Sequence, residues 1–178
     1  MLIAASHAST DNAALTAPAS EPSPLQISSR ALGDITVSTE WVMHFPLPLG
    51  GFPTQQEFVL IPAAREGLWW LQSMSDADLT FILADPFVLD SGYGLDLGDA
   101  ERHMLHIGNE TDTFALVMIT LPNEESASAT ANCRAPVVFN LRQQVALQVV
   151  SRDDAHDVRR SIDLSIYKPQ AIGLRLQR

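Results

Sequence analysis

From residue 35 onward the chain consists of short apolar runs, each about as long as a β-strand and each followed by residues that end strands. Residues 35–39 alternate between apolar and polar, and proline, glycine or an SDAD cluster separates the next runs. The runs of strand length cover residues 58–61, 68–71, 80–84, 113–121, 136–141 and 145–151. Several short strands with frequent turns predict a mainly β fold, a small barrel-like antiparallel domain.

One short helix is expected at residues 98–107, between two of these runs. Its acidic residues, Asp99 and Glu101, come early, and its basic residues come late, an order that suits the helix dipole. Asp96 is the expected N-cap. Alternating apolar residues at 162, 164 and 166 predict one further strand.

The domain plan follows from length and composition. A chain of 178 residues that is 46% hydrophobic is long enough for one domain with a single core. Residues 1–29 are rich in Ala, Ser, Thr and Pro and contain no aromatic residue, so we expect a disordered N-terminal extension. The folded domain is expected at 30–170, and 171–178 form a basic tail. Since the opening segment has no basic n-region and no long apolar run, we predict no signal peptide, no membrane span and a cytoplasmic location.

The net charge of −10 argues against direct binding of nucleic acid, which depends on cations that neutralise phosphates. Between Arg65 and Arg102 the chain has no lysine or arginine but many acids. These acids are a candidate acidic patch, either solvated surface or a partner-docking site. The predicted patch consists of Asp76, Asp78, Asp90, Asp96, Asp99 and Glu101.

Motifs for catalysis or metal binding are weak. His103 and His106 are spaced i, i+3 on the expected helix, but no further ligands are apparent, so exposed helix histidines are favoured over a metal site. The single cysteine, Cys133, has no evident pairing base. Gly50 and Gly51 lack the lysine of a phosphate loop. We therefore expect no catalytic residue, no metal and no cofactor.

Several motifs occur in a fixed order along the chain. They are Gly51-Phe52-Pro53, an apolar strand, Leu71-Gln72-Ser73, a strand closed by Asp85-Pro86, the block TANCRAPVVFN at 130–140, and Gln148. In this order the chain resembles the FliW family of flagellar assembly factors over about residues 35–168. It departs from the family pattern at Cys133, where leucine is usual. A cysteine fills less volume there, so the change concerns local packing.

The resemblance implies a small β-barrel that binds proteins and is not an enzyme. Its implied partners are flagellin and the RNA-binding translational repressor CsrA, and a monomer is expected. The resemblance also implies an exchange of partners. The protein binds CsrA when free flagellin is scarce, and flagellin binds the protein again when its concentration rises. The motif residues that we assign to partner binding are Phe52, Gln72, Ser73, Asp85, Tyr93, Asn132, Pro136 and Asn140.

A structural role is the alternative for most of these residues. Asn and Gln amides satisfy backbone groups at turns, and an Asp before proline is usually a turn residue. Phe52 and Trp41 are either interface anchors or plugs at an end of the barrel. Trp69 and Trp70 are adjacent, so on a strand one faces inward while the other faces a partner or a covering element. The alternative function is a small β-barrel ligand- or cofactor-binding protein or enzyme, and a third is a β-domain interaction module unrelated to flagella.

Overall fold

The computed structural model describes residues 2–3, 23–108, 113–122 and 128–168. The first half of the chain contains β1 (Leu2–Ile3), β2 (Pro24–Ser29), β3 (Gly33–Ser38), η1 (Thr39–Trp41), β4 (Val42–His44), β5 (Glu57–Pro62), β6 (Leu68–Ser73) and β7 (Thr80–Ala84). The second half contains α1 (Pro86–Leu89), β8 (Leu95–Asp96), α2 (Asp99–Met104), β9 (Thr113–Thr120), β10 (Ala129–Asn140), β11 (Val145–Gln148), β12 (Arg160–Ile162) and η2 (Leu164–Ile166).

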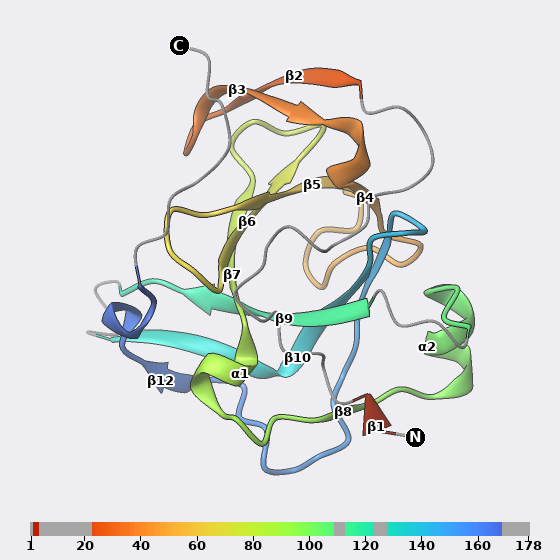
Figure 1. The fold of residues 1–178 in the computed structure, drawn as a ribbon, viewed down its shortest axis with the longest axis vertical. Helices are drawn as coiled ribbons and strands as arrows, with labels where there is room; N and C mark the ends of the chain where they lie inside the picture. The colour runs from red at the N-terminus through yellow and green to blue at the C-terminus, as the bar shows by residue number, and fades with distance from the viewer. Residues whose placement is uncertain (1, 4–22, 109–112, 123–127, 169–178) are drawn as a thin grey trace.

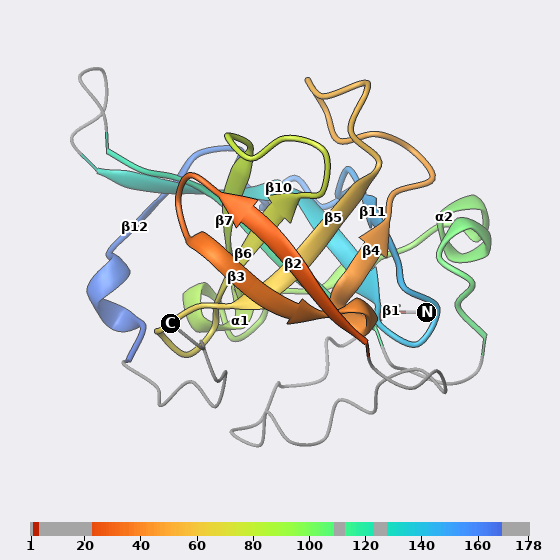
Figure 2. The ribbon, with the colours of Figure 1, turned by 90° about the horizontal axis from the view of Figure 1, so that it is seen from above.

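Seven strands close into a barrel in the order β4, β5, β6, β7, β9, β10 and β11 (Figure 1), and β11 returns to pair with β4 (Figure 2). The pairing of β11 with β4 is parallel, whereas the other pairs around the barrel are antiparallel. β10 makes closure possible, since its first half pairs with β12 and its second half with β11. A bulge between Asn132 and Val137 separates the two halves. The predicted barrel-like, mainly β fold is confirmed.

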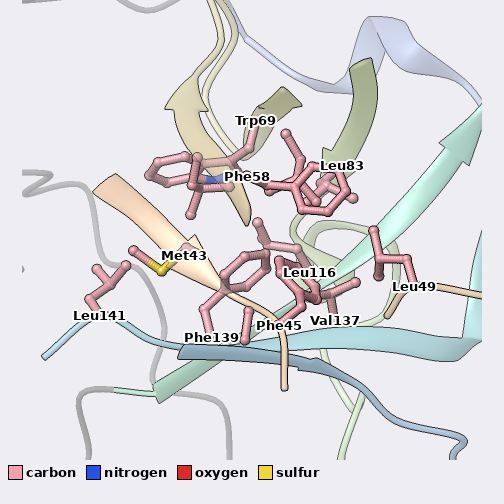
Figure 3. Packing of buried hydrophobic residues seen from close by; sticks show 13 residues of the cluster. Met43, Phe45, Leu49, Phe58, Trp69, Leu83, Leu116, Val137, Phe139 and Leu141 are labelled. Carbon is pink, nitrogen blue, oxygen red and sulfur yellow. The ribbon is translucent and has the colours of Figure 1, made fainter. Parts of the chain in front are cut away.

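The barrel interior is a packed core of large apolar side chains (Figure 3). Phe45 stands edge-on to Phe58, with ring centroids 5.1 Å apart, and also edge-on to Phe139, with centroids 6.5 Å apart. The two adjacent tryptophans of β6 separate as the strand period requires. Trp69 belongs to this core, while Trp70 packs against clusters outside the barrel wall.

Three added segments cover apolar patches on the outside of the barrel wall. The β2–β3 hairpin lies across β5 and β6, where Ile35 and Val37 pack on Val59 and Ile61 (Figure 2). A second segment, formed by α1 and the chain after β12, covers β6, β7, β9 and β10. The third, formed by β8 and α2, covers β10 and β11. The strand segments beneath these covers therefore carry apolar side chains on their outer face.

Several local expectations were wrong. Residues 24–29, expected in the disordered extension, form β2, because Leu25 and Ile27 pack over the barrel wall. There are two short α-helices among the described residues, not one, and the expected helix at 98–107 is confined to α2. The N-cap of α2 is Gly98, whose amide donates to the Glu101 carboxylate in the first turn. The expected cap, Asp96, lies in β8 instead.

The expected strand at 162–166 is also wrong in its second half, which forms η2. Asp163 caps η2 by accepting a hydrogen bond from the Ser165 amide at 2.9 Å. Residues 4–22 of the expected extension and the basic tail at 171–178 lie outside the described residues. Within the described part of the chain, no helix has the length and apolarity to cross a membrane.

Candidate functional site

The Leu-Gln-Ser motif at the end of β6 holds the turn that leads into β7. The Gln72 amide is fully buried and donates to the carbonyls of Ser73 at 3.1 Å and Asp76 at 2.8 Å, while its oxygen accepts from Thr80. The Ser73 hydroxyl donates to Gln55 at 2.7 Å and accepts from the Asp76 amide at 3.2 Å. Buried polar groups need such partners. Gln72 and Ser73 therefore shape the β6–β7 turn from within.

The bulge of β10 joins two other motifs. The Asn132 side-chain oxygen accepts from the Ala135 amide at 3.0 Å, a bond that lies within the bulge. The Gln148 amide donates to the Ala135 carbonyl at 3.3 Å, and its oxygen accepts from the Gly50 amide at 3.1 Å. Pro136 is buried in the same bulge. One glutamine thus connects the Gly-Phe-Pro loop to the Ala-Pro segment, which lie far apart in sequence.

Tyr93 supports the same bulge from outside the barrel. Its buried hydroxyl donates to the Cys133 carbonyl at 2.9 Å, and its ring stacks on His156 with centroids 4.3 Å apart. Burial raises the pKa of the Cys133 thiol, so the thiol is protonated at neutral pH. A buried thiol of this kind is a poor nucleophile, in agreement with its expected packing role.

Asp85 and Asn140 each hold one of the two α-helices. Asp85 is the N-cap of α1, and its carboxylate accepts from the Phe87 amide at 2.8 Å, with proline at the first helical position. Asn140 is buried, donates to the Leu105 carbonyl at 2.9 Å and accepts from the Gln143 amide at 3.2 Å. Asn140 therefore ties the end of α2 to the β10–β11 turn.

Phe52 and Trp41 both pack against the core. Phe52 is half-buried and stands edge-on to Phe81, with centroids 5.0 Å apart. Trp41 packs on Trp69 at 6.0 Å. Both contacts match the plug alternative for Phe52 and Trp41.

The structure separates the six acids of the predicted patch into three places. These are Asp76 with Asp78 in the β6–β7 turn, Asp90 after α1, and Asp96, Asp99 and Glu101 in β8 and α2. α1 and α2 lie on different parts of the barrel (Figure 1). Acids that follow one another in the sequence are therefore not brought together on one surface.

An arginine accompanies each of the three acidic groups. The ion pairs are Arg30 with Asp78 at 3.2 Å, Arg160 with Asp90 at 3.1 Å, and Arg152 with Glu101 at 3.8 Å. A backbone hydrogen bond from Gly92, followed by the bond from Arg160, lowers the pKa of Asp90. Ion pairs this exposed contribute little to stability, and each arginine offsets part of the negative charge at its place.

The filled interior bears on the alternative functions. Side chains from all around the barrel meet in its centre (Figure 3), so a ligand held inside the barrel would have to displace the core. His103 and His106 gain no further ligands, since the described residues contain no group of three side chains able to hold a metal ion.

Sequence reasoning missed several residues that complete these networks. Gln55 and Thr80 complete the network of the β6–β7 turn, and Ser151 holds His156 through a hydroxyl contact of 2.7 Å to its Nδ1 atom. None of them stands in a recognisable pattern. Gln148 is different, because its place shortly after the Ala-Pro block is part of the quoted motif order.

The molecule is therefore a small closed β-barrel whose interior is filled with side chains and whose motif residues hold turns and a bulge. The FliW protein family model matches residues 26–162. The flagellar assembly factor FliW of Leptospira interrogans is 30% identical over 139 residues, 78% of this chain and 93% of that protein.

A second relative and a solved structure agree with this match. The flagellar assembly factor FliW of Desulfovibrio desulfuricans is 35% identical over 133 residues, 73% of this chain and 80% of that protein. A crystal structure of the flagellar assembly factor FliW superposes with a TM-score of 0.70 at 27% identity, covering 77% of this chain and 96% of that one. The chain belongs to the FliW family.

Proposed function

We propose that this chain is a cytoplasmic flagellar assembly factor that binds flagellin and antagonises the translational repressor CsrA by protein–protein binding. The observation that carries the proposal is the family membership, with relatives named as flagellar assembly factors. When free flagellin is scarce, the protein engages CsrA and weakens its hold on flagellin mRNA. Rising flagellin recaptures the protein, so synthesis follows export. This exchange requires two binding modes that exclude or weaken each other.

Charge supports antagonism of an RNA-binding protein. CsrA must be basic where it meets RNA, because phosphate neutralisation dominates that affinity. A chain of net charge −10 bound beside that surface adds a negative potential that repels phosphates. The same charge opposes direct contact of this chain with RNA. The protein would therefore act on CsrA and not on the message.

Structural roles of the motif residues support binding without catalysis. Gln72, Ser73 and Asn140 are buried and bonded to neighbouring backbone or side-chain groups, and the Cys133 thiol is buried. Their fixed geometry keeps the surface loops in one conformation, which lowers the entropy lost on binding a partner. A monomeric scaffold is sufficient for this role, and light scattering on the purified chain would measure its mass in solution.

The test is calorimetry with the flagellin and the CsrA encoded in the same genome, each titrated alone and then in competition. We expect binding to both and displacement of CsrA by flagellin. Failure of both partners to bind the folded chain would refute the proposal. Binding of flagellin alone would retain the assembly role and remove the regulatory one.

A second assay measures the consequence for RNA. Fluorescence anisotropy of labelled flagellin leader RNA with CsrA is expected to show weaker binding when this protein is added, and recovery when flagellin follows. An unrelated protein of similar size and net charge is the control for nonspecific charge effects. CsrA–RNA affinity that stays the same at saturating protein would contradict the antagonism.

A further inference from the structure

Strands β7 and β9 are apolar on both faces, yet the outer face is covered over only part of their length. On β9, Leu116 and Met118 point into the barrel, and Val117 and Ile119 point outward. Strands with apolar side chains on both faces are normally covered on both sides. The outer face of the half nearer α1 is covered, since Ala84 and Val117 are buried in one cluster with Tyr167.

Among the residues that the structure describes, this cover does not extend over the half of these strands that lies nearer the β6–β7 turn. Trp70, Ile82 and Ile119 are neighbours across β6, β7 and β9, and all three are only half-buried. Leu121 continues the outward alternation just beyond β9, and 48% of it is exposed. These four side chains form one face on the outside of the barrel, which we call the outer apolar face.

Carboxylates border this face at one end. The next outward pair of β6 and β7 is Gln72 and Thr80, and directly beyond it lies the turn that carries Asp76 and Asp78. Both aspartates are exposed, and Asp78 is paired with Arg30 at 3.2 Å, so Asp76 carries the negative charge of this margin. The buried amide of Gln72 bonds the Asp76 carbonyl at 2.8 Å, which holds the turn in place beside the face. The surface thus combines apolar area with nearby negative charge.

A complementary partner has an apolar patch next to cationic side chains. Of the two partners in the proposed function, the RNA-binding one is required to be basic. We propose that the outer apolar face is the docking surface for CsrA, an inference that rests on the proposed function. Trp70 lies between Ile61 and Ile82 in the strand pairing and serves as the central anchor, since tryptophan often dominates the energy of protein interfaces.

Docking here uses side chains that the fold leaves incompletely covered. The carboxylates at the margin orient the basic partner and increase its association rate at low salt. In this arrangement flagellin binds a different surface of the barrel. The exchange of partners then requires that flagellin bound at one surface weakens the binding of CsrA at the other.

The experiment replaces apolar side chains by serine and measures both partners by calorimetry. The double variant Ile82→Ser/Leu121→Ser is expected to bind CsrA about ten-fold or more weakly. Its affinity for flagellin is expected to stay within about two-fold. Val88→Ser and Val150→Ser are the matched controls, because these valines are exposed on other parts of the barrel, at 44% and 67%. Thermal unfolding identifies any variant that has lost its fold, and Leu121→Ser alone then serves as the milder test.

A charge variant tests whether the carboxylates beside the outer apolar face contribute to CsrA binding. Asp76→Asn keeps the side-chain oxygen that accepts from the Asp78 amide at 2.9 Å but removes the charge. It is expected to reduce the salt dependence of CsrA binding, while Asp99→Asn on α2 leaves it unchanged.

The outcomes separate this inference from the proposed function. If the folded serine variants bind CsrA with wild-type affinity, only the proposed docking surface is overturned. Loss of flagellin binding in place of CsrA binding also overturns it, and identifies flagellin as the occupant. A wild-type chain that binds neither protein refutes the proposed function itself.

Discussion

Two buried tyrosines lie in the same outer cluster but differ in the partner of their hydroxyl group. Tyr93 donates to the Cys133 carbonyl at 2.9 Å, whereas the buried Tyr167 hydroxyl has no hydrogen-bond partner among the residues that the structure describes. Tyr93→Phe leaves a buried carbonyl of the β10 bulge without its donor, which costs about 1–3 kcal/mol. Tyr167→Phe removes a buried hydroxyl and leaves no described acceptor unpaired, so we expect a change of about 0–1 kcal/mol, in the stabilising direction.

Urea denaturation and thermal unfolding of the two variants measure this contrast. For a domain of this size, about 2 kcal/mol corresponds to a decrease in Tm of about 4–8 °C, which we expect for Tyr93→Phe only. Because both variants remove one oxygen from a buried ring, the loss of volume is matched. A Tyr167→Phe variant destabilised as much as Tyr93→Phe, or a Tyr93→Phe variant as stable as wild type, would refute the reasoning.

Three further predictions concern pH, a polar tie and a turn. Burial raises the pKa of Tyr93 and Tyr167, so the unfolded chain loses those protons first and the folded state loses stability as pH rises above about 10. The double phenylalanine variant should lose less, as urea titrations at about pH 8 and about pH 11 would show. Asn140→Ala leaves a carbonyl and an amide unpaired and should cost about 2–3 kcal/mol in urea denaturation; equal stability would contradict its role. Gly67→Ala combines a φ of +77° with a new Cβ 3.3 Å from the Tyr167 ring, so its Tm should fall further than that of Gly33→Ala, which has the same φ in open space.

The strands were predictable because their signal is local. Residues 80–84 and 113–121 are apolar and β-branched, and they form β7 and β9 nearly as expected. The closure of the barrel has no such signal. It depends on β10 pairing with β12 along its first half and with β11 along its second, around the bulge after Asn132. A change of partner within one strand is decided by contacts between distant segments.

The candidate site was predictable in part for the same reason. Asp85 before a proline suggested a turn, and the structure makes it the N-cap of α1. The role of Gln148 depends on Gly50, which lies far away in sequence, whereas the bonds of Gln72 join groups within its own β6–β7 turn. The acidic run illustrates the opposite error, because Asp76, Asp90 and Asp99 are near in sequence and the fold carries them to different places.

By itself, the sequence determined that the chain forms many short strands, that its motifs occur in the order of one family, and that its charge disfavours nucleic acid. These properties follow from strand propensity, motif order and composition, which do not depend on contacts between distant segments. Only the tertiary structure decided that the barrel closes, which motif amides are buried, and which apolar side chains outside β6, β7 and β9 stay partly exposed. Those outcomes depend on where the β2–β3 hairpin, α1 and the chain after β12 come to lie on the wall, because burial is a property of packed neighbours and not of a residue.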